Sequence, residues 1–541
     1  MINLWPFSLT DSNSLLRGKN LVISSLVVFF LGCNQLPPRE EGEHRRPLKE
    51  DIGQISFPRL DGGHQTPPGT DGGQTPPPET DGGQTPPPGT DGGQTPPPET
   101  DGGQTPPPET DGGQTPPPET DGGVADCSHL LGGESLLSPE PTEEEEFGLS
   151  LATSGNVLLT GARGKTVAGS PSSGAAYVFE RSPSGTWVLS GEILPKDPNV
   201  GDRFGTAVGV SGRFAVIGAF LGRTELVRTG AAYIFEKQED GVWRQHAKLT
   251  PPSGQALDLF GASVAIDGER VVVGAFRNGS YEAGTAYVYV KQGEDWVLEG
   301  TLSASDPQQY AHFGISVTIS GETVVVGADA DDELGDAAGA AYVFSRQNGV
   351  WREQAKLRAS GGDQEDFFGY PVDIDGDTIA VGAHLDETPA GESGAVYIFQ
   401  RDGASGWHEQ ARLVPNDAVA WDAFGVSVAV LGNTVVVGAY QKEAASGSIY
   451  VFKRVDQSWA QIERIQHNIP TPRAEFGISV DVSRDGFIAG GAPGFTTAGI
   501  RTGNVYVLND DDMCQLEPAT PATQSILDSA RTPLILRSAS R

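Results

Sequence analysis

Cysteine is scarce in this sequence: only three of the 541 residues are cysteine, at Cys33, Cys127 and Cys514. So few thiols exclude a disulfide-rich scaffold and the paired cysteines of structural zinc sites. Basic residues are also few, with 37 Lys and Arg against 71 Asp and Glu, which gives a net charge of −34. This charge repels nucleic acid and anionic membrane surfaces, so we expect neither as a direct partner.

Sequence signatures of catalysis are missing as well. The repeated region contains no HExxH, no GxSxG and no phosphate-binding glycine loop, and its histidines are scattered. Paired carboxylates are plentiful, but any acidic surface supplies them, so they do not indicate a glycosidase by themselves. We therefore expect a non-enzymatic protein, and a carbohydrate-active hydrolase is the less favoured alternative.

Long hydrophobic runs are absent, and the run from Leu21 to Leu31 has only eleven residues. A helix needs about 20 residues to span a bilayer, so the run is typical of an export signal, with Arg17 and Lys19 before it. The Gly-Cys pair that ends at Cys33 resembles a bacterial lipoprotein signal, which implies a signal peptide over 1–33 and diacylation of Cys33. Simple secretion and an uncleaved anchor remain alternatives. The resemblance also implies an outer-membrane or cell-surface location, because Asn34 is not the acidic residue that favours inner-membrane retention in such lipoproteins.

Residues 34–60 form a polar linker, and a proline-rich stretch follows at 61–123. Six decapeptides fill residues 61–120, and five of them read DGGQTPPPET or DGGQTPPPGT. Proline favours the polyproline II conformation, the Asp-Gly-Gly of each unit allows a bend, and no apolar side chain is available for a core. The composition predicts a disordered stalk that reaches about 190 Å when fully extended.

The pair Phe-Gly recurs at a nearly constant spacing, which indicates one modular domain rather than several unrelated ones. It occurs at Phe147, Phe204, Phe260, Phe313, Phe368, Phe424 and Phe476. Each copy predicts four short strands: an alternating FGxSVxI strand, a buried VVVGA strand, a GAAYVF strand and a strand that carries a tryptophan. The first two strands are expected to meet at two-residue turns such as Asp267-Gly268, Ser320-Gly321 and Asp375-Gly376. Seven such units predict an all-β, seven-bladed β-propeller of four-stranded antiparallel blades over residues 124–516.

The order FGxSV, GA, GAAYVF resembles the FG-GAP repeat family, whose best-known members are the β-propeller heads of integrin α subunits. The resemblance implies a propeller that binds a ligand. Calcium-binding integrin blades carry a DxDxDG loop between the first two strands, whereas this sequence has a two-residue turn there. We therefore interpret Asp373, Asp375 and Asp377 as part of a strand and its hairpin, and the calcium sites of integrins are not carried over.

The seven units contain only six tryptophan strands, because the chain becomes tail-like after Leu508. Leu136 and Leu137 match the end of a fourth strand, so we expect the N-terminal segment to complete the last blade and remove an open edge. Cys127 and Cys514 flank this closure, and in an exported chain they are predicted to form a disulfide; two free thiols are the alternative. Residues 517–541 lack the repeat and are predicted to be a disordered tail.

The loops that differ between the copies join the second strand to the third, and the fourth strand to the next first strand. Both kinds are expected on one face, where loops on a rigid scaffold usually bind ligands. This face is acidic, and its aspartates are Asp197, Asp202, Asp258, Asp306, Asp366, Asp386, Asp417 and Asp422. Four aromatic residues outside the repeat pattern are candidate ligand contacts, with packing between blades as the alternative: Tyr281, Tyr310, Trp421 and Phe495.

One loop, from Ala328 to Gly339, concentrates acidic residues. Its candidate calcium ligands are Asp329, Asp331, Asp332 and Asp336. Carboxylate oxygens at alternate positions suit calcium, but the spacing matches no known calcium loop, so we favour solvated acidic side chains over a calcium site.

These patterns together predict a lipid-anchored or secreted surface protein, monomeric, that displays a propeller on a stalk and captures a protein or glycan. A structural envelope component without a discrete ligand is the competing prediction.

Overall fold

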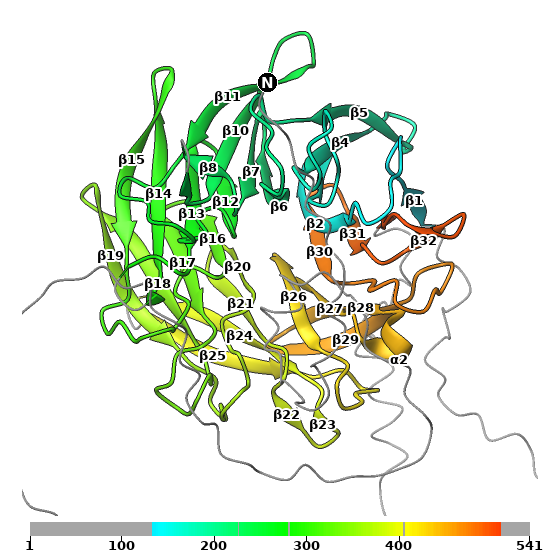
Figure 1. The fold of residues 1–541 in the computed structure, drawn as a ribbon. Helices are drawn as coiled ribbons and strands as arrows, with labels where there is room; N and C mark the ends of the chain where they lie inside the picture. The colour runs from blue at the N-terminus through cyan, green and yellow to red at the C-terminus, as the bar shows by residue number, and fades with distance from the viewer. Residues whose placement is uncertain (1–132, 225–226, 280–281, 404–405, 510–541) are drawn as a thin grey trace, which may run out of the picture. The chain divides into compact units, whose positions relative to one another are not determined.

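The structure is an all-β propeller of seven four-stranded antiparallel sheets. The computed structural model describes residues 133–509, except 225–226, 280–281 and 404–405. The signal segment, the proline-rich stretch, residues 510–541 and all three cysteines lie outside the described residues, so the lipid anchor and the disulfide stay predictions. Figure 1 shows the seven sheets arranged around a common axis.

Six blades are built from strands in chain order. The first three blades contain β2 (Phe147–Ser154), β3 (Val157–Ala162), β4 (Ala175–Arg181) and β5 (Trp187–Ile193); β6 (Phe204–Ser211), β7 (Phe214–Ala219), β10 (Ala231–Lys237) and β11 (Trp243–Leu249); and β12 (Val264–Asp267), β13 (Arg270–Ala275), β14 (Thr285–Gln292) and β15 (Asp295–Leu302).

The next three blades contain β16 (Val317–Ser320), β17 (Thr323–Ala328), β18 (Ala340–Gln347) and β19 (Val350–Leu357); β20 (Val372–Asp375), β21 (Thr378–Ala383), β24 (Ala395–Asp402) and β25 (Gly406–Leu413); and β26 (Phe424–Leu431), β27 (Thr434–Ala439), β28 (Ser448–Val455) and β29 (Ser458–Ile465). The first strand of every blade contacts the first strands of both neighbours, so the first strands surround the axis.

The seventh blade joins the two ends of the described chain, as the sequence predicts. It contains β30 (Ser479–Ser483), β31 (Phe487–Ala492), β34 (Asn504–Asn509) and β1 (Glu134–Leu136). In the antiparallel register of β1 and β34, Leu136 pairs with Val505, and the Leu136 side chain is buried in a core cluster with Phe147. Figure 1 shows β1 beside the last strands of the chain. The N-terminal strand therefore closes the ring and covers an edge that would otherwise be open.

The second strands form the most buried layer of each blade. Every residue of β17 and β21 is buried, because both faces of these β-branched strands are covered by neighbouring blades. The tight turns between the first and second strands lie one residue later than predicted. Asp267 pairs with Arg270, and Gly268, with a φ of 56°, begins the turn. Glycine takes this position because it enters the left-handed region without steric cost.

Asp375 ends its strand in the same way, so the hairpin interpretation of this segment is confirmed. It pairs with Thr378, and its carboxylate accepts a hydrogen bond at 2.8 Å from the backbone N–H of Gly432 in the next blade. The remaining elements are three two-residue hairpins and one short turn of helix: β8 (Arg223–Thr224) with β9 (Val227–Arg228), β22 (Glu387–Thr388) with β23 (Gly391–Glu392), β32 (Thr496–Thr497) with β33 (Ile500–Arg501), and α2 (Lys442–Ala445). Among the described residues, no helix has the length and apolar character to cross a membrane.

Candidate functional site

The loops that vary between blades meet on one face of the ring, which we call the variable-loop face. It consists of the second-to-third-strand loops and the fourth-to-first-strand loops. Backbone hydrogen bonds tie each kind to the other across a blade boundary: the N–H of Leu257 donates to the carbonyl of Arg228, and the N–H of Trp421 donates to the carbonyl of Glu392, both at 2.7 Å. The face is therefore a continuous surface on a rigid ring, as expected for a binding face.

A repeated backbone conformation presents side chains on this face. The residue three positions before each Phe-Gly pair has a positive φ, between 60° and 73°. These residues are Glu144, Gly201, Leu257, Tyr310, Glu365, Trp421 and Arg473. Only one of the seven is glycine, although a residue with a side chain is strained in this region by about 1 kcal/mol. Backbone strain of this kind often accompanies a functional role, so this set of positions is the starting point for a binding site.

Two of the four predicted aromatic contacts occupy these positions. Tyr310 and Trp421 are each 52% exposed, which is high for residues of their size. Other exposed apolar side chains lie on the same loops: Val200, Leu257, Leu334 and Val419. An aromatic side chain with two rotatable bonds gives a large contact area at a low entropic cost, so Tyr310 and Trp421 can anchor a ligand.

The other two aromatic candidates lie elsewhere. Phe495 is only 8% exposed and belongs to a core cluster, where its ring centroid is 4.9 Å from that of His467. The packing alternative therefore describes Phe495 in this structure. Tyr281 lies outside the described residues.

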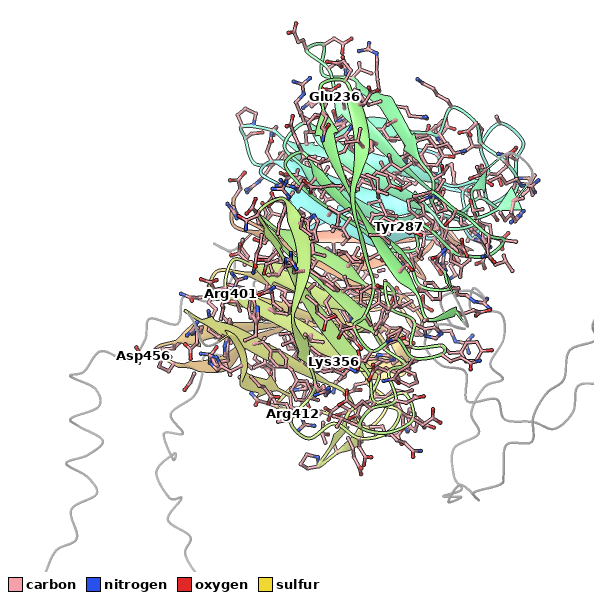
Figure 2. All side chains as sticks on the ribbon, turned by 90° about the vertical axis from the view of Figure 1, so that its left-hand side faces the viewer. Glu236, Tyr287, Lys356, Arg401, Arg412 and Asp456 are labelled. Atoms are coloured by element: carbon pink, nitrogen blue, oxygen red, sulfur yellow. The ribbon has the colours of Figure 1, made fainter. Side chains whose placement is uncertain are left out.

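Many acidic side chains of the face are held by cations and tyrosine hydroxyls. Lys356, at the loop end of β19 (Figure 2), contacts the carboxylates of Asp306, Asp331 and Glu333, each at 2.8 Å. The hydroxyl oxygen of Tyr342 lies 2.8 Å from a carboxylate oxygen of Asp306 and 2.9 Å from one of Asp331, so its single proton is shared between the two carboxylates. Burial alone would lower the pKa of Lys356, but its hydrogen bonds to the carboxylates outweigh burial and raise the pKa. These acidic residues stabilise the loops and are not free to bind a ligand.

A second group of aspartates caps the fourth-to-first-strand loops. Asp258 accepts a hydrogen bond from the backbone N–H of Gln255 at 2.6 Å, and Asp366 accepts one from Asp363 at the same distance. Both aspartates are buried. Burial raises the pKa of both carboxyl groups, that of Asp366 to about 6. Much of the acidity that the sequence assigns to this face is therefore internal.

The four candidate calcium ligands are distributed among different interactions. Asp329 is buried and contacts Nδ1 of His312 at 2.9 Å, while Asp331 is buried against Lys356. Asp332 accepts a hydrogen bond from the backbone N–H of Ala337 at 2.9 Å, and Asp336 is exposed. Within the described residues, no three His, Cys, Asp or Glu side chains gather in a way that could hold a metal ion. The favoured interpretation of solvated acidic side chains is wrong for Asp329 and Asp331, because both are buried and paired.

Three neighbouring glutamates at the β22–β23 hairpin, which contacts Trp421, were not identified from the sequence. Glu387 and Glu392 stand directly opposite each other in the β22–β23 hairpin, and Glu365 is the blade-five equivalent of Trp421. An alignment of the seven copies on the position three residues before Phe-Gly identifies Glu365 together with Tyr310 and Trp421. The hairpin residues carry no such sequence signal.

Comparison with known families identifies the repeat. The family model described as FG-GAP repeat matches residues 134–179, 187–235, 243–289, 296–344, 351–399 and 407–452. Each matched segment begins at the fourth strand of one blade and ends within the third strand of the next, so one sequence repeat bridges two blades. In the seventh blade only the fourth strand, β1, lies within a matched segment, although the blade has the same four strands as the others. No curated protein matches the chain.

Proposed function

Because the chain belongs to the FG-GAP repeat family, whose propellers are commonly binding domains and usually non-catalytic, we propose that it is a surface binding protein. In this proposal a lipid at Cys33 anchors the protein in the outer membrane, and residues 61–123 act as a stalk. The propeller then captures a protein or glycan on the variable-loop face, as a monomer.

The strained, half-exposed Trp421 is the observation that carries the proposal. Its φ of 71° costs free energy, and its ring is exposed rather than packed in the core. All seven blades share the positive φ, so the exposed ring is what favours a binding role over a structural envelope component without a ligand. A hydrolase is less favoured, because the buried carboxylates of the face are occupied as loop caps and ion pairs.

We expect the substitution Trp421→Gly to weaken ligand capture without harming the fold. Glycine relieves the strained backbone, so the free energy of unfolding should stay the same or rise by about 0.5 kcal/mol. Loss of the aromatic anchor should weaken binding at least tenfold, since central aromatic residues contribute about 2 kcal/mol or more. The measurement combines a glycan array and a pull-down from envelope extract with thermal unfolding of the full chain.

Val455→Ala is the matched control, because Val455 is exposed at the end of β28, away from the variable loops. Capture that is unchanged in Trp421→Gly and in Tyr310→Gly would contradict a binding role for this face.

The proposed anchor has its own test. Labelled palmitate should enter the wild-type protein in cells and should not enter a Cys33→Ala variant. Label that is absent from the wild type, or present in the variant, would contradict lipidation at this residue.

A further inference from the structure

The carboxylates of the variable-loop face fall into two groups, and only one of them has counter-ions. Besides the Lys356 cluster, Lys442 contacts Asp422 at 2.8 Å, and Lys165 contacts Glu145 at 3.0 Å. In contrast, the side chains of Glu365, Glu387 and Glu392 make no ion pair or hydrogen bond within the described part of the chain. Arg412 lies beside the hairpin, but its guanidinium pairs with the carboxylate of Asp386 and donates to the backbone carbonyl of Glu387. The three glutamate carboxylates therefore have no counter-ion among the described residues.

The three glutamates lie close enough to repel one another. Glu387 and Glu392 are directly opposite each other in an antiparallel pair, an arrangement that is destabilising for like charges. Partial burial raises the pKa of Glu392, and the charges of Glu365 and Glu387 raise it further. A cation placed among these side chains would remove the repulsion.

An exposed apolar surface adjoins the hairpin at Glu392. The backbone N–H of Trp421 donates to the backbone carbonyl of Glu392, so Trp421 lies next to the β22–β23 hairpin. Trp421 and its neighbour Val419 are both exposed. Uncompensated negative charge beside an exposed indole ring matches the head of a Lys or Arg side chain, and the apolar residues match its aliphatic stem.

We propose that this surface, made of Glu365, Glu387, Glu392, Val419 and Trp421, docks a basic segment of a partner protein. The proposal rests on the binding role of the variable-loop face and narrows it to one partner chemistry. A lysine or arginine of the partner lies over the Trp421 ring and contacts the carboxylates, and an apolar neighbour covers Val419. A neutral glycan would leave the three carboxylates uncompensated, so charge complementarity favours the basic segment.

The test measures binding of two synthetic peptides, acetyl-(Lys-Leu-Gly)4-amide and acetyl-(Glu-Leu-Gly)4-amide, to the full chain by calorimetry. The wild type should bind the basic peptide and not the acidic one. The triple variant Glu365→Gln, Glu387→Gln, Glu392→Gln should bind it at least tenfold more weakly, which is about 1.4 kcal/mol. Trp421→Ala should weaken binding about 3- to 30-fold through loss of the cation–π contact.

A charge-matched control separates a site from the general attraction of an acidic protein. The variant Glu239→Gln, Glu269→Gln, Glu294→Gln changes the net charge equally at exposed positions in the tight turns, outside the variable loops. It should change the affinity less than twofold. Equal weakening in both triple variants, or no binding of the basic peptide, would overturn the proposal. If Trp421→Gly abolishes capture of a neutral glycan while the peptide does not bind, the binding role stands and this partner chemistry is wrong.

Discussion

Gly327→Ala should destabilise the propeller by about 3 kcal/mol or more, although it adds only one methyl group to a β-strand. Gly327 lies in β17 and belongs to the Gly-Ala pair of blade four. A Cβ atom built on it would be 1.8 Å from the carbonyl oxygen of Gly369 in blade five. No real Cβ approaches an oxygen so closely, so one of the two blades has to move.

Neither backbone is free to move. The N–H of Gly327 donates to the carbonyl of Ser316, and its own carbonyl accepts from Gly314, both at 2.9 Å. The N–H of Gly369 donates to the carbonyl of Gly382. Relief of the clash therefore breaks hydrogen bonds between buried backbone groups, and each unsatisfied group costs about 1 to 3 kcal/mol.

Thermal unfolding of the full chain measures the effect, and we expect the melting temperature to fall by roughly 4 °C or more. Gly361→Ala is the control, since a Cβ at Gly361 has no heavy atom within 4 Å. This variant should differ from the wild type by less than about 0.5 kcal/mol. A melting temperature of Gly327→Ala equal to that of Gly361→Ala would show that the blades do not depend on this contact.

The same contact recurs at every blade boundary and explains the two glycine pairs of the repeat. In each blade, a Cβ on the glycine of Gly-Ala would lie 1.8 to 2.2 Å from the carbonyl oxygen of the next Phe-Gly glycine. The seven glycines concerned are Gly161, Gly218, Gly274, Gly327, Gly382, Gly438 and Gly491. The repeat motif therefore encodes the packing of one blade on the next, and ligand contacts have to come from the loops.

The number of blades and the way in which the ring closes could both be predicted from the sequence. Blade number follows from seven equivalent Phe-Gly pairs, and ring closure follows from a missing fourth strand that Leu136 supplies. Both depend on periodicity and on the requirement that sheet edges be paired. Neither depends on the surroundings of an individual side chain.

The candidate site was less predictable, because burial of a single side chain depends on loops from two blades. Phe495 and Trp421 are both aromatic residues outside the repeat pattern, yet one is in the core and the other is half exposed. Asp331 and Asp332 are adjacent, yet only Asp331 contacts Lys356. Sequence spacing contains no information on such contacts between strands that lie far apart in the chain.

Another expectation concerns Asp481, which joins the last blade to the first. Asp481 lies in β30, an innermost strand, and its carboxylate accepts the backbone N–H of Thr153 in β2 at 2.6 Å and that of Val482 at 2.8 Å. Burial raises its pKa to about 7, and the negative charge of Asp373 in β20 contributes to this shift. Asp373 is itself held by the hydroxyl of Thr318 and the N–H of Val430.

The raised pKa means that the folded protein binds the proton of Asp481 more tightly than the unfolded chain does. This contribution to stability is complete below pH 4 and is lost as the pH rises to about 7. The rise in the pKa of Asp481 from 3.8 to about 7 corresponds to at most about 4 kcal/mol of unfolding free energy. Asp481→Asn should therefore raise the free energy of unfolding at pH 8 by about 2 kcal/mol, because the amide is neutral but can accept only one of the two hydrogen bonds. At pH 4.5 the same variant should be equal to the wild type or slightly less stable. Denaturant unfolding from pH 4.5 to 8.5 measures the free energy of unfolding of both proteins, and Asp485→Asn, at an exposed position, is the control. The prediction is wrong if the wild type becomes more stable relative to Asp481→Asn as the pH rises from 5 to 8.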